Sequence, residues 1–372
     1  MSILRPIVIL LLTFSTHFHG QRSSHFDVRL VLDYESAEKT VELYKGLSGR
    51  PSEIAQLRGS RIALATTSLL AQRVLDIHTL EAALEEAKFD QISGDDVFRL
   101  KEARRAVGAI EGLLIEIKRR NFARKVTSTV EQLFPPDANI VTSIPIYFVA
   151  FGHHNINAYV RRVAWRGHVP IFVGEGEGEL TIVVNLARAV YSGETVDERF
   201  IGTLSVVAHE VFHAAFGVHK DNSPIWHDYY IKHRTYLDQL LDLTQNEGIA
   251  HYLTFEQRFR GYLPPDWNQK VRASFEQFNE SAGELLSPSI PSHRANELIR
   301  TSNTASYWDS YGAITGLFIA RQIDQALGRA RLVETVASGP FDYFEKYIAL
   351  MERDNNLPKL SDDIVRFVER SR

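Results

Sequence analysis

The chain has 372 residues, of which 44% are hydrophobic and 24% are charged. These proportions exclude an intrinsically disordered protein, because they provide ample apolar material for a core. The net charge of −4 gives no reason to expect nucleic acid or an anionic membrane as a partner, and the absence of cysteine excludes disulfides, thiolate zinc ligands and a cysteine nucleophile.

The first residues are typical of a secretory signal peptide. Arg5 precedes an apolar run over residues 7–14, which is too short to span a bilayer, and small and polar residues follow it. We therefore predict a signal peptide at residues 1–20, although a cut after Gly20 would leave Phe18 where a small residue is usual. A chain of this size without cysteine is expected in the periplasm or outside a bacterial cell. We expect no stable membrane insertion.

A helical pattern extends from about residue 34 to residue 133. In SAEKTVELYKGL, for example, Ala37, Val41 and Tyr44 recur at helical spacing. The segment FPPDAN at residues 134–139 then breaks the pattern. We therefore predict an N-terminal helical region over residues 21–135 and a second region over residues 136–372.

After this break the hydrophobic period changes from 3.6 to 2. The segments NIVTSIPIYFVAF, AYVRRVAWRGHVPIFV and ELTIVVNLARAV are rich in β-branched and aromatic residues, which predicts strands. We expect the run TIVVNLARA to be an edge strand that could add an extended peptide by backbone hydrogen bonds.

Helices return with a capping box, in which Thr195 caps the helix and Glu198 reaches back to it. We predict that this helix ends at Phe216, with Gly217 as its stop signal. The remainder of the chain is mainly helical. The predicted fold class is therefore α+β, mainly helical, with a small β-sheet.

The capped helix contains HEVFH, in which two histidines and a glutamate lie in an apolar sequence. His209 and His213 are four residues apart, so both project from one face and can bind a single metal ion, for which zinc is the best fit. Glu210 lies about 100° around the helix and suits the role of general base toward a zinc-activated water. Burying such groups without a metal would be costly.

Two residues could supply a third ligand, and they imply different enzyme classes. His219 follows His213 by six residues, as in metzincins, but the glycine is one place late at Gly217 and a methionine turn is lacking. Glu247 lies on a second apolar helix, in NEGIAHYL. A non-catalytic metal site is a further alternative, because His251 or His219 could close it as a fourth ligand.

With these motifs the chain resembles a bacterial family of zinc-dependent peptidases of the gluzincin (HExxH…E) type. The resemblance rests on AHEVFH and NEGIAHYL, and IPIYFVAFG and YWDSYGAITGLFIARQI support it. It implies a gluzincin-like core over residues 136–372, with a small sheet beside the HExxH helix, one zinc ion and Glu247 as the third ligand. It also implies a peptide or protein substrate, and small residues at Gly248 and Ala250 that let the two helices approach.

Gluzincins also use residues around the zinc ligands. For a donor to the oxyanion we expect Tyr311 first, with Tyr307 and His293 as alternatives. Asp242 is a candidate to orient a zinc histidine, because His251 occupies the place where related enzymes have a carboxylate. Exopeptidases of this class hold the substrate amine with glutamates, and Glu177 or Glu179 could do so here.

Overall fold

A computed structural model describes residues 25–92, 94–153, 157–174, 177–259, 264–304 and 308–371. The predicted signal peptide at residues 1–20 and Tyr307 lie outside the described residues.

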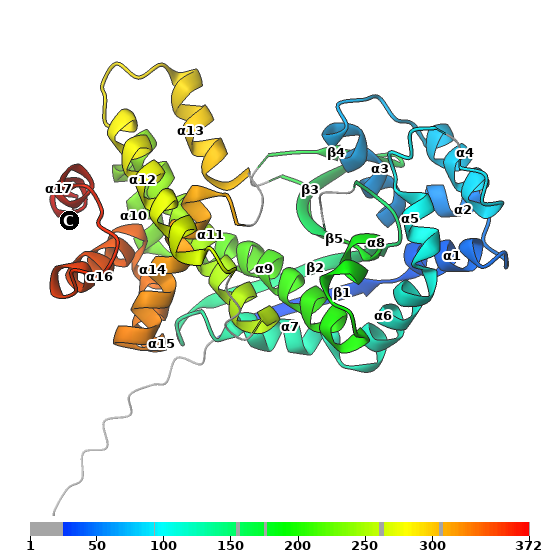
Figure 1. Ribbon diagram of the computed structural model, residues 1–372, viewed down its shortest axis with the longest axis horizontal. Helices are drawn as coiled ribbons and strands as arrows, with labels where there is room; N and C mark the ends of the chain where they lie inside the picture. Colours follow the sequence, from blue (N-terminus) through cyan, green and yellow to red (C-terminus); the bar gives the residue numbers. More distant parts are fainter. Residues whose placement is uncertain are drawn as a thin grey trace, which may run out of the picture.

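A five-stranded mixed sheet lies in the half of the molecule shown on the right of Figure 1. Parallel pairing joins β1 to β2 and β2 to β5, whereas β3 pairs antiparallel with both β5 and β4. The three predicted strand segments are confirmed, and β1 is an additional strand. The strands, in the order in which they lie in the sheet, are β1 (His25–Asp33), β2 (Asn139–Val149), β5 (Glu179–Asn185), β3 (Ala158–Arg166) and β4 (Val169–Phe172).

The prediction that TIVVNLARA is an edge strand is wrong. Its first part is β5, which lies between β2 and β3 in the interior of the sheet. Thr181 to Asn185 are buried on both faces, and a continuous apolar run of this kind is typical of an interior strand. The strand then ends, because the Asn185 side chain accepts the Ala187 amide and caps a short helix, α8 (Leu186–Ala189).

The pairing of β3 is incomplete at one edge. β5 pairs with β3 from Ala158 to Val163, whereas β4 pairs only with Val163 to Arg166. Among the described strands, the first half of β3 therefore has a neighbour on the β5 side alone.

The N-terminal region is helical, as predicted, although it also provides β1. Because β1 pairs with β2, this region and the following one share the sheet, and the division at residue 135 stays a prediction. Its helices are α1 (Glu35–Tyr44), α2 (Pro51–Gln56), α3 (Arg58–Leu70), α4 (Ile77–Lys88), α5 (Leu100–Arg105), α6 (Val107–Arg119) and α7 (Phe122–Glu131).

Helix α9 (Val196–Asn222) begins with the predicted capping box but continues past Gly217, so the predicted stop is wrong. It ends where Ser223 caps the next helix, α10 (Pro224–Lys232), whose proline cannot continue the helix before it. By length and composition α9 could cross a membrane, but it is mostly buried within the molecule and packs against β2, β3 and β5.

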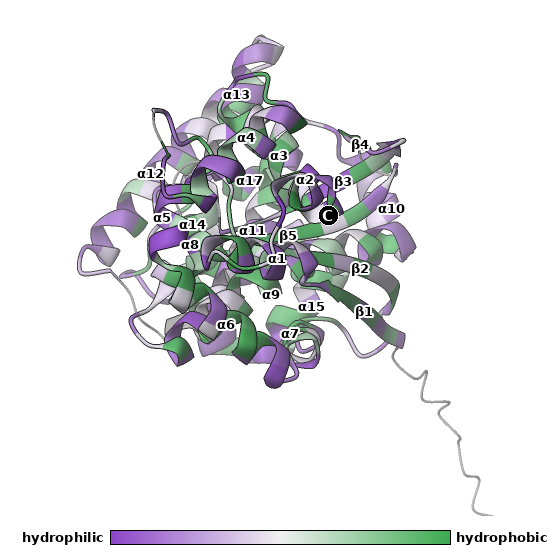
Figure 2. Cartoon of the chain, turned by 90° about the vertical axis from the view of Figure 1, so that its right-hand side faces the viewer, coloured by the Kyte–Doolittle hydropathy of each residue, from purple (hydrophilic) through white to green (hydrophobic). Residues whose placement is uncertain are grey.

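The remaining helices form the other half of the molecule, and α9 and α11 lie between them and the sheet (Figure 1). Hydrophobic residues concentrate on the strands and the inner helix faces (Figure 2). The mainly helical α+β fold is thus confirmed. The helices not yet given are α11 (Tyr236–Phe259), α12 (Trp267–Leu285), α13 (Ser292–Thr304), α14 (Tyr311–Leu327), α15 (Arg329–Ser338), α16 (Pro340–Arg353) and α17 (Asp362–Arg370). A short 3-10 helix (Val190–Ser192) instead lies on the sheet side, beside α6, α8 and α9.

Candidate metal centre

Three side chains that can bind a metal ion meet between α9 and α11. His209 and His213 come from α9 and Glu247 from α11, and one ligand atom of each lies within 4.8 Å of the other two. The two Nε2 atoms are 3.0 Å apart. Glu247 Oε2 lies 3.7 Å from His209 Nε2 and 3.4 Å from His213 Nε2.

Hydrogen bonds to α11 set the tautomer of both histidines. His213 Nδ1 lies 3.0 Å from Asn246 Oδ1, an oxygen that only accepts, so Nδ1 carries the proton. His209 Nδ1 lies 3.2 Å from the Thr254 hydroxyl, which itself donates to the Ala250 carbonyl and therefore accepts from His209. In the neutral form of each ring, Nε2 is thus the nitrogen with the lone pair that a metal requires.

These distances fit a zinc ion. Ligands held tetrahedrally at about 2.0–2.2 Å from zinc lie about 3.3–3.6 Å from one another. The separations of 3.0, 3.4 and 3.7 Å are close to this range. The side chains of His209, His213 and Glu247 remain 14%, 20% and 22% exposed, so solvent reaches the group.

Without a metal, the group carries an internal charge pair. Burial by itself would raise the pKa of Glu247, but the nearby histidines, His213 above all, hold this pKa well below its usual value. Burial likewise opposes a charge on His213, yet the Glu247 carboxylate raises the pKa of His213 to about 9. In His209, burial and the two neighbouring histidines lower the pKa.

Glu210 lies on the side of α9 that faces β3. Burial raises the pKa of its carboxyl group to about 7, and the Glu247 carboxylate adds to this shift. His213, Arg161 and the backbone N–H of Val160 act on Glu210 in the opposite direction. A bound dication would also favour the charged form of this group.

The structure does not group His219 with the two α9 histidines. Because α9 remains helical through Gly217, His219 lies about 240° around the helix from His213. Its ring is buried and packs against Phe134 and Phe216. The helical turn that a third histidine ligand needs after His213 is therefore missing.

His251 lies beside the ligands without belonging to their group in the described part of the chain. Its ring packs edge-on against His209, with centroids 4.9 Å apart. Its Nδ1 lies 2.9 Å from the carbonyl oxygen of Glu247, to which it donates. The orientation of His209 comes instead from Thr254, three residues further along α11.

Asp242 does not orient a zinc histidine, contrary to the sequence-based expectation. Its two oxygens accept from Lys220 at 2.5 Å and from the Tyr230 hydroxyl at 2.8 Å. Asn246, one turn further along α11, contacts His213 in its place.

The expectation that a small residue at Gly248 lets α11 approach α9 is also wrong. Gly248 faces Gly316 of α14, not α9, and a β-carbon there would lie 2.4 Å from the Gly316 backbone. Small size at Gly248 therefore serves the contact between α11 and α14.

Tyr311 opens α14 and is not brought together with the ligands. Its buried hydroxyl donates to the Leu298 carbonyl of α13 at 2.8 Å. The alternative His293 is an exposed residue of α13, and Glu179 forms an ion pair with Arg58 at 3.7 Å. A role for Tyr311 on an oxyanion stays a prediction.

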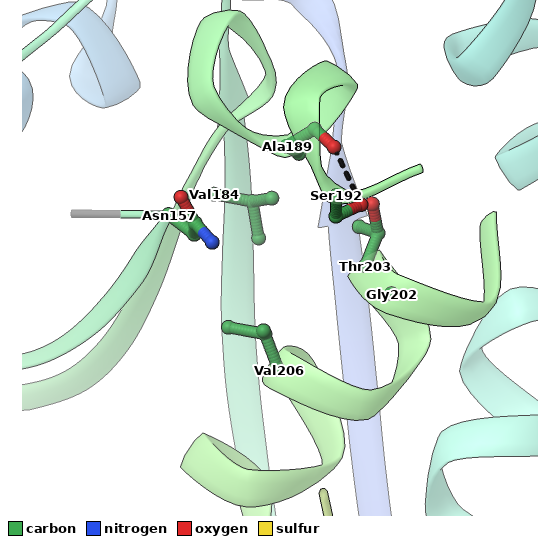
Figure 3. A pocket seen from close by; sticks show the side chains of 7 residues that line it. All are labelled: Asn157, Val184, Ala189, Ser192, Gly202, Thr203 and Val206. Atoms are coloured by element: carbon green, nitrogen blue, oxygen red, sulfur yellow. Dashed lines mark hydrogen bonds between the residues drawn. The ribbon is translucent and has the colours of Figure 1, made fainter. Parts of the chain in front are cut away.

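A small, mostly apolar pocket lies against the first turns of α9 (Figure 3). Val206, one helical turn before Glu210, contributes to its wall, and the Ser192 hydroxyl in the pocket is bonded to the Ala189 carbonyl. No titratable side chain lines it among the described residues. Its lining residues are Asn157, Val184, Ala189, Ser192, Gly202, Thr203 and Val206.

Sequence reasoning missed Asn246, Thr254 and Arg161. Asn246 precedes Glu247 directly, and Thr254 lies two helical turns beyond it, so the apolar α11 sequence held a signal for both. No comparable sequence pattern indicated Arg161, because the residues around its side chain depend on how β3 and β4 pair.

Comparison with known proteins agrees with this geometry. A family model described as "Putative zinc dependent peptidase (DUF5700)" matches residues 62–356, which include all three candidate ligands. Neither the curated proteins nor the solved structures gave a match. The cofactor is zinc, for which His209, His213 and Glu247 form a fitting group. Because the match covers most of the chain, the protein belongs to the family with this description.

Proposed function

We propose that the protein is an exported zinc peptidase of the gluzincin type, which hydrolyses peptide bonds with Glu210 as general base. The observation that carries this proposal is the meeting of Glu247 with His209 and His213 across two helices. A glutamate from a second helix is the third ligand that the resemblance to gluzincins implies. A group of three protein ligands is also typical of catalytic zinc sites, whereas structural sites have four.

His209, His213 and Glu247 would hold a zinc ion, which would act as a Lewis acid by polarising a carbonyl and lowering the pKa of water. Glu210 accepts the proton of the attacking water and passes it to the nitrogen of the leaving amine. Without a metal, burial raises the pKa of Glu210 to about 7, and a bound zinc ion would lower this pKa and so favour the carboxylate that accepts the proton. Asn246 and Thr254 keep both imidazoles in the tautomer that binds metal.

Metal content and cleavage, measured together, test this proposal. We expect about one zinc ion per chain in the parent protein, which should cut members of a peptide library. Glu247→Ala should lose the zinc, whereas His219→Ala, as the matched control, should keep it. Glu210→Gln should keep zinc and cut nothing. A parent protein that binds no zinc when zinc is offered, or an active Glu210→Gln, would contradict the proposal.

Tyr311 remains a proposed donor to the oxyanion. To act, its hydroxyl must leave the Leu298 carbonyl, so Tyr311→Phe distinguishes the two roles. Loss of an oxyanion donor should lower kcat by about 100- to 1000-fold. Unchanged kcat with lowered stability would leave Tyr311 a structural residue.

The proposal of export rests on residues 1–20 and on the lack of cysteine. Expression of the full chain in a bacterium should yield periplasmic or secreted protein whose mass has fallen by that of a signal peptide. A chain that stays in the cytoplasm at full mass would contradict export.

A further inference from the structure

A further cationic side chain, Arg161, belongs to β3, the strand that packs against α9 and whose Val160 N–H acts on Glu210. Each affects the charge of the other: Arg161 favours the ionised form of Glu210, and Glu210 favours that of Arg161. Arg161 nevertheless forms no ion pair with a described residue. Among the described residues, this cation therefore has no anionic partner.

The guanidinium of Arg161 is only partly satisfied. Nη1 donates to the Val160 carbonyl at 2.9 Å. The group also lies over the rings of Tyr159 and Phe172, 5.1 and 5.4 Å from their centroids. Nε is buried and has no acceptor among the described residues. A buried charged donor without an acceptor is costly, and burial accordingly lowers the pKa of Arg161.

The guanidinium reaches the edge of β3 that lacks a strand partner. The Asn157 carbonyl accepts from Asn185, next to β5, and the Arg162 carbonyl accepts from Val173 on the opposite side. Because backbone directions alternate along a strand, the Val160 carbonyl points the same way as that of Arg162. Arg161 Nη1 therefore meets Val160 at the open edge, where the Val160 N–H also acts on Glu210.

We propose that Arg161 binds a carboxylate of the substrate next to the scissile bond. A guanidinium presents Nε and Nη2 as a fork that matches the two oxygens of a carboxylate. A neutral carbonyl group would also accept a hydrogen bond from Nε, but it would not neutralise the charge of the guanidinium. This inference rests on the proposed peptidase function and narrows its substrate class to peptides with a carboxylate at this position.

The carboxylate could be the C-terminus of the peptide or the side chain of an aspartate or glutamate. An amine anchor for a free N-terminus has less support, because Glu179 is engaged by Arg58. The unpaired charge on β3 is that of the Arg161 cation, which would repel a protonated amine.

Binding of three small peptides tests the proposal. The probes are N-acetyl-trialanine with a free C-terminal carboxylate, the same peptide as its C-terminal amide, and N-acetyl-Ala-Glu-Ala amide. Their affinities are measured by calorimetry on zinc-loaded Glu210→Gln protein, so that cleavage does not interfere. Arg161→Gln and Arg161→Lys are then added to this background, with Arg166→Gln, an exposed arginine of the same strand, as matched control.

We expect the free acid or the glutamate peptide to bind about 10- to 100-fold more tightly than the trialanine amide. The stronger of the two identifies the source of the carboxylate. Arg161→Gln should abolish this preference and Arg166→Gln should keep it. Arg161→Lys should reduce it, because an ammonium keeps the charge but lacks the fork.

Equal affinity for all three peptides, including undetectable binding of each, overturns the proposal. So does a preference that persists in Arg161→Gln, because the carboxylate would then bind the zinc ion instead. Zinc content and thermal unfolding show whether Arg161→Gln is folded. If it is not folded, the preference measured with Arg161→Lys decides the test. The ratio of affinities for acid and amide is independent of cleavage, so a failure here is distinct from a failure of the peptidase proposal.

Discussion

Gly248 and Gly316 bring the backbones of α11 and α14 into contact directly beside Glu247. A β-carbon on Gly248 would lie 2.4 Å from the α-carbon of Gly316. A β-carbon on Gly316 would lie 2.1 Å from the Thr244 carbonyl oxygen. The position of Glu247 is therefore set by α14 on one side of α11 as well as by α9 on the other.

Replacing either glycine should move α11. In Gly248→Ala and Gly316→Ala the added methyl group would meet backbone, which cannot rotate away, and we expect a loss of about 1–3 kcal/mol in the free energy of unfolding. Zinc affinity should fall as well. Gly217→Ala is the matched control, because a β-carbon there meets nothing within 4 Å, and it should gain about 0.5–1 kcal/mol. Urea unfolding of the three variants measures the difference.

Asn246 and Thr254 should set the affinity for zinc without binding it. Asn246→Leu and Thr254→Val remove the acceptors that fix the two imidazole tautomers, and we expect each to weaken zinc binding by about 10- to 100-fold. Competition with a chromogenic chelator measures this, and Asn268→Leu, on the exposed face of α12, is the control. Unchanged affinity in both variants would show that the tautomers are set in another way.

Zinc binding should release about one proton near pH 8. In the metal-free protein, Glu247 raises the pKa of His213 to about 9, so His213 is protonated below that pH and must lose its proton to bind metal. The apparent affinity for zinc should consequently rise with pH up to about pH 9 and then level off. Calorimetry in buffers of different ionisation enthalpy counts the protons. An affinity independent of pH between 7 and 9 would contradict the charge pair inferred here.

Asp242 should be a stabilising residue and not a determinant of zinc binding. Lys220 and Asp242 keep only 11% and 17% side-chain exposure, and the ammonium lies over Phe216 and Trp226. Asp242→Asn leaves this buried cation unpaired, which should cost about 3 kcal/mol of unfolding free energy while zinc content is unchanged.

The control for this variant is Asp228→Asn, whose partner Lys232 is exposed. That pair should contribute less than about 1 kcal/mol. If Asp242→Asn lost zinc and kept its stability, the sequence-based assignment of Asp242 as an orienting residue would be restored.

Much of the candidate site follows from short-range patterns in the sequence. A separation of four residues puts His209 and His213 on one face of any helix, and Thr195 and Glu198 start that helix through contacts three residues apart. The strands and the helical regions are similarly visible in their hydrophobic periods.

Other features depended on contacts between segments distant in the sequence. The sequence left His219 and Glu247 as rivals, and α9 decided between them by continuing through Gly217, which turns His219 into the core. β5 is an interior strand because it pairs with β2 on one side and with β3 on the other, and both of these strands lie earlier in the chain.

The amino-acid sequence by itself thus determined the candidate metal-binding pair, the candidate base and the class of fold, because each rests on local spacing or composition. Only the tertiary structure decided that Glu247 meets this pair, that Asn246 and Thr254 contact its histidines, and that Arg161 lies on the strand beside α9. The physical reason is that packing of α11 between α9 and α14, and the partial pairing of β3, bring together residues that no periodicity relates.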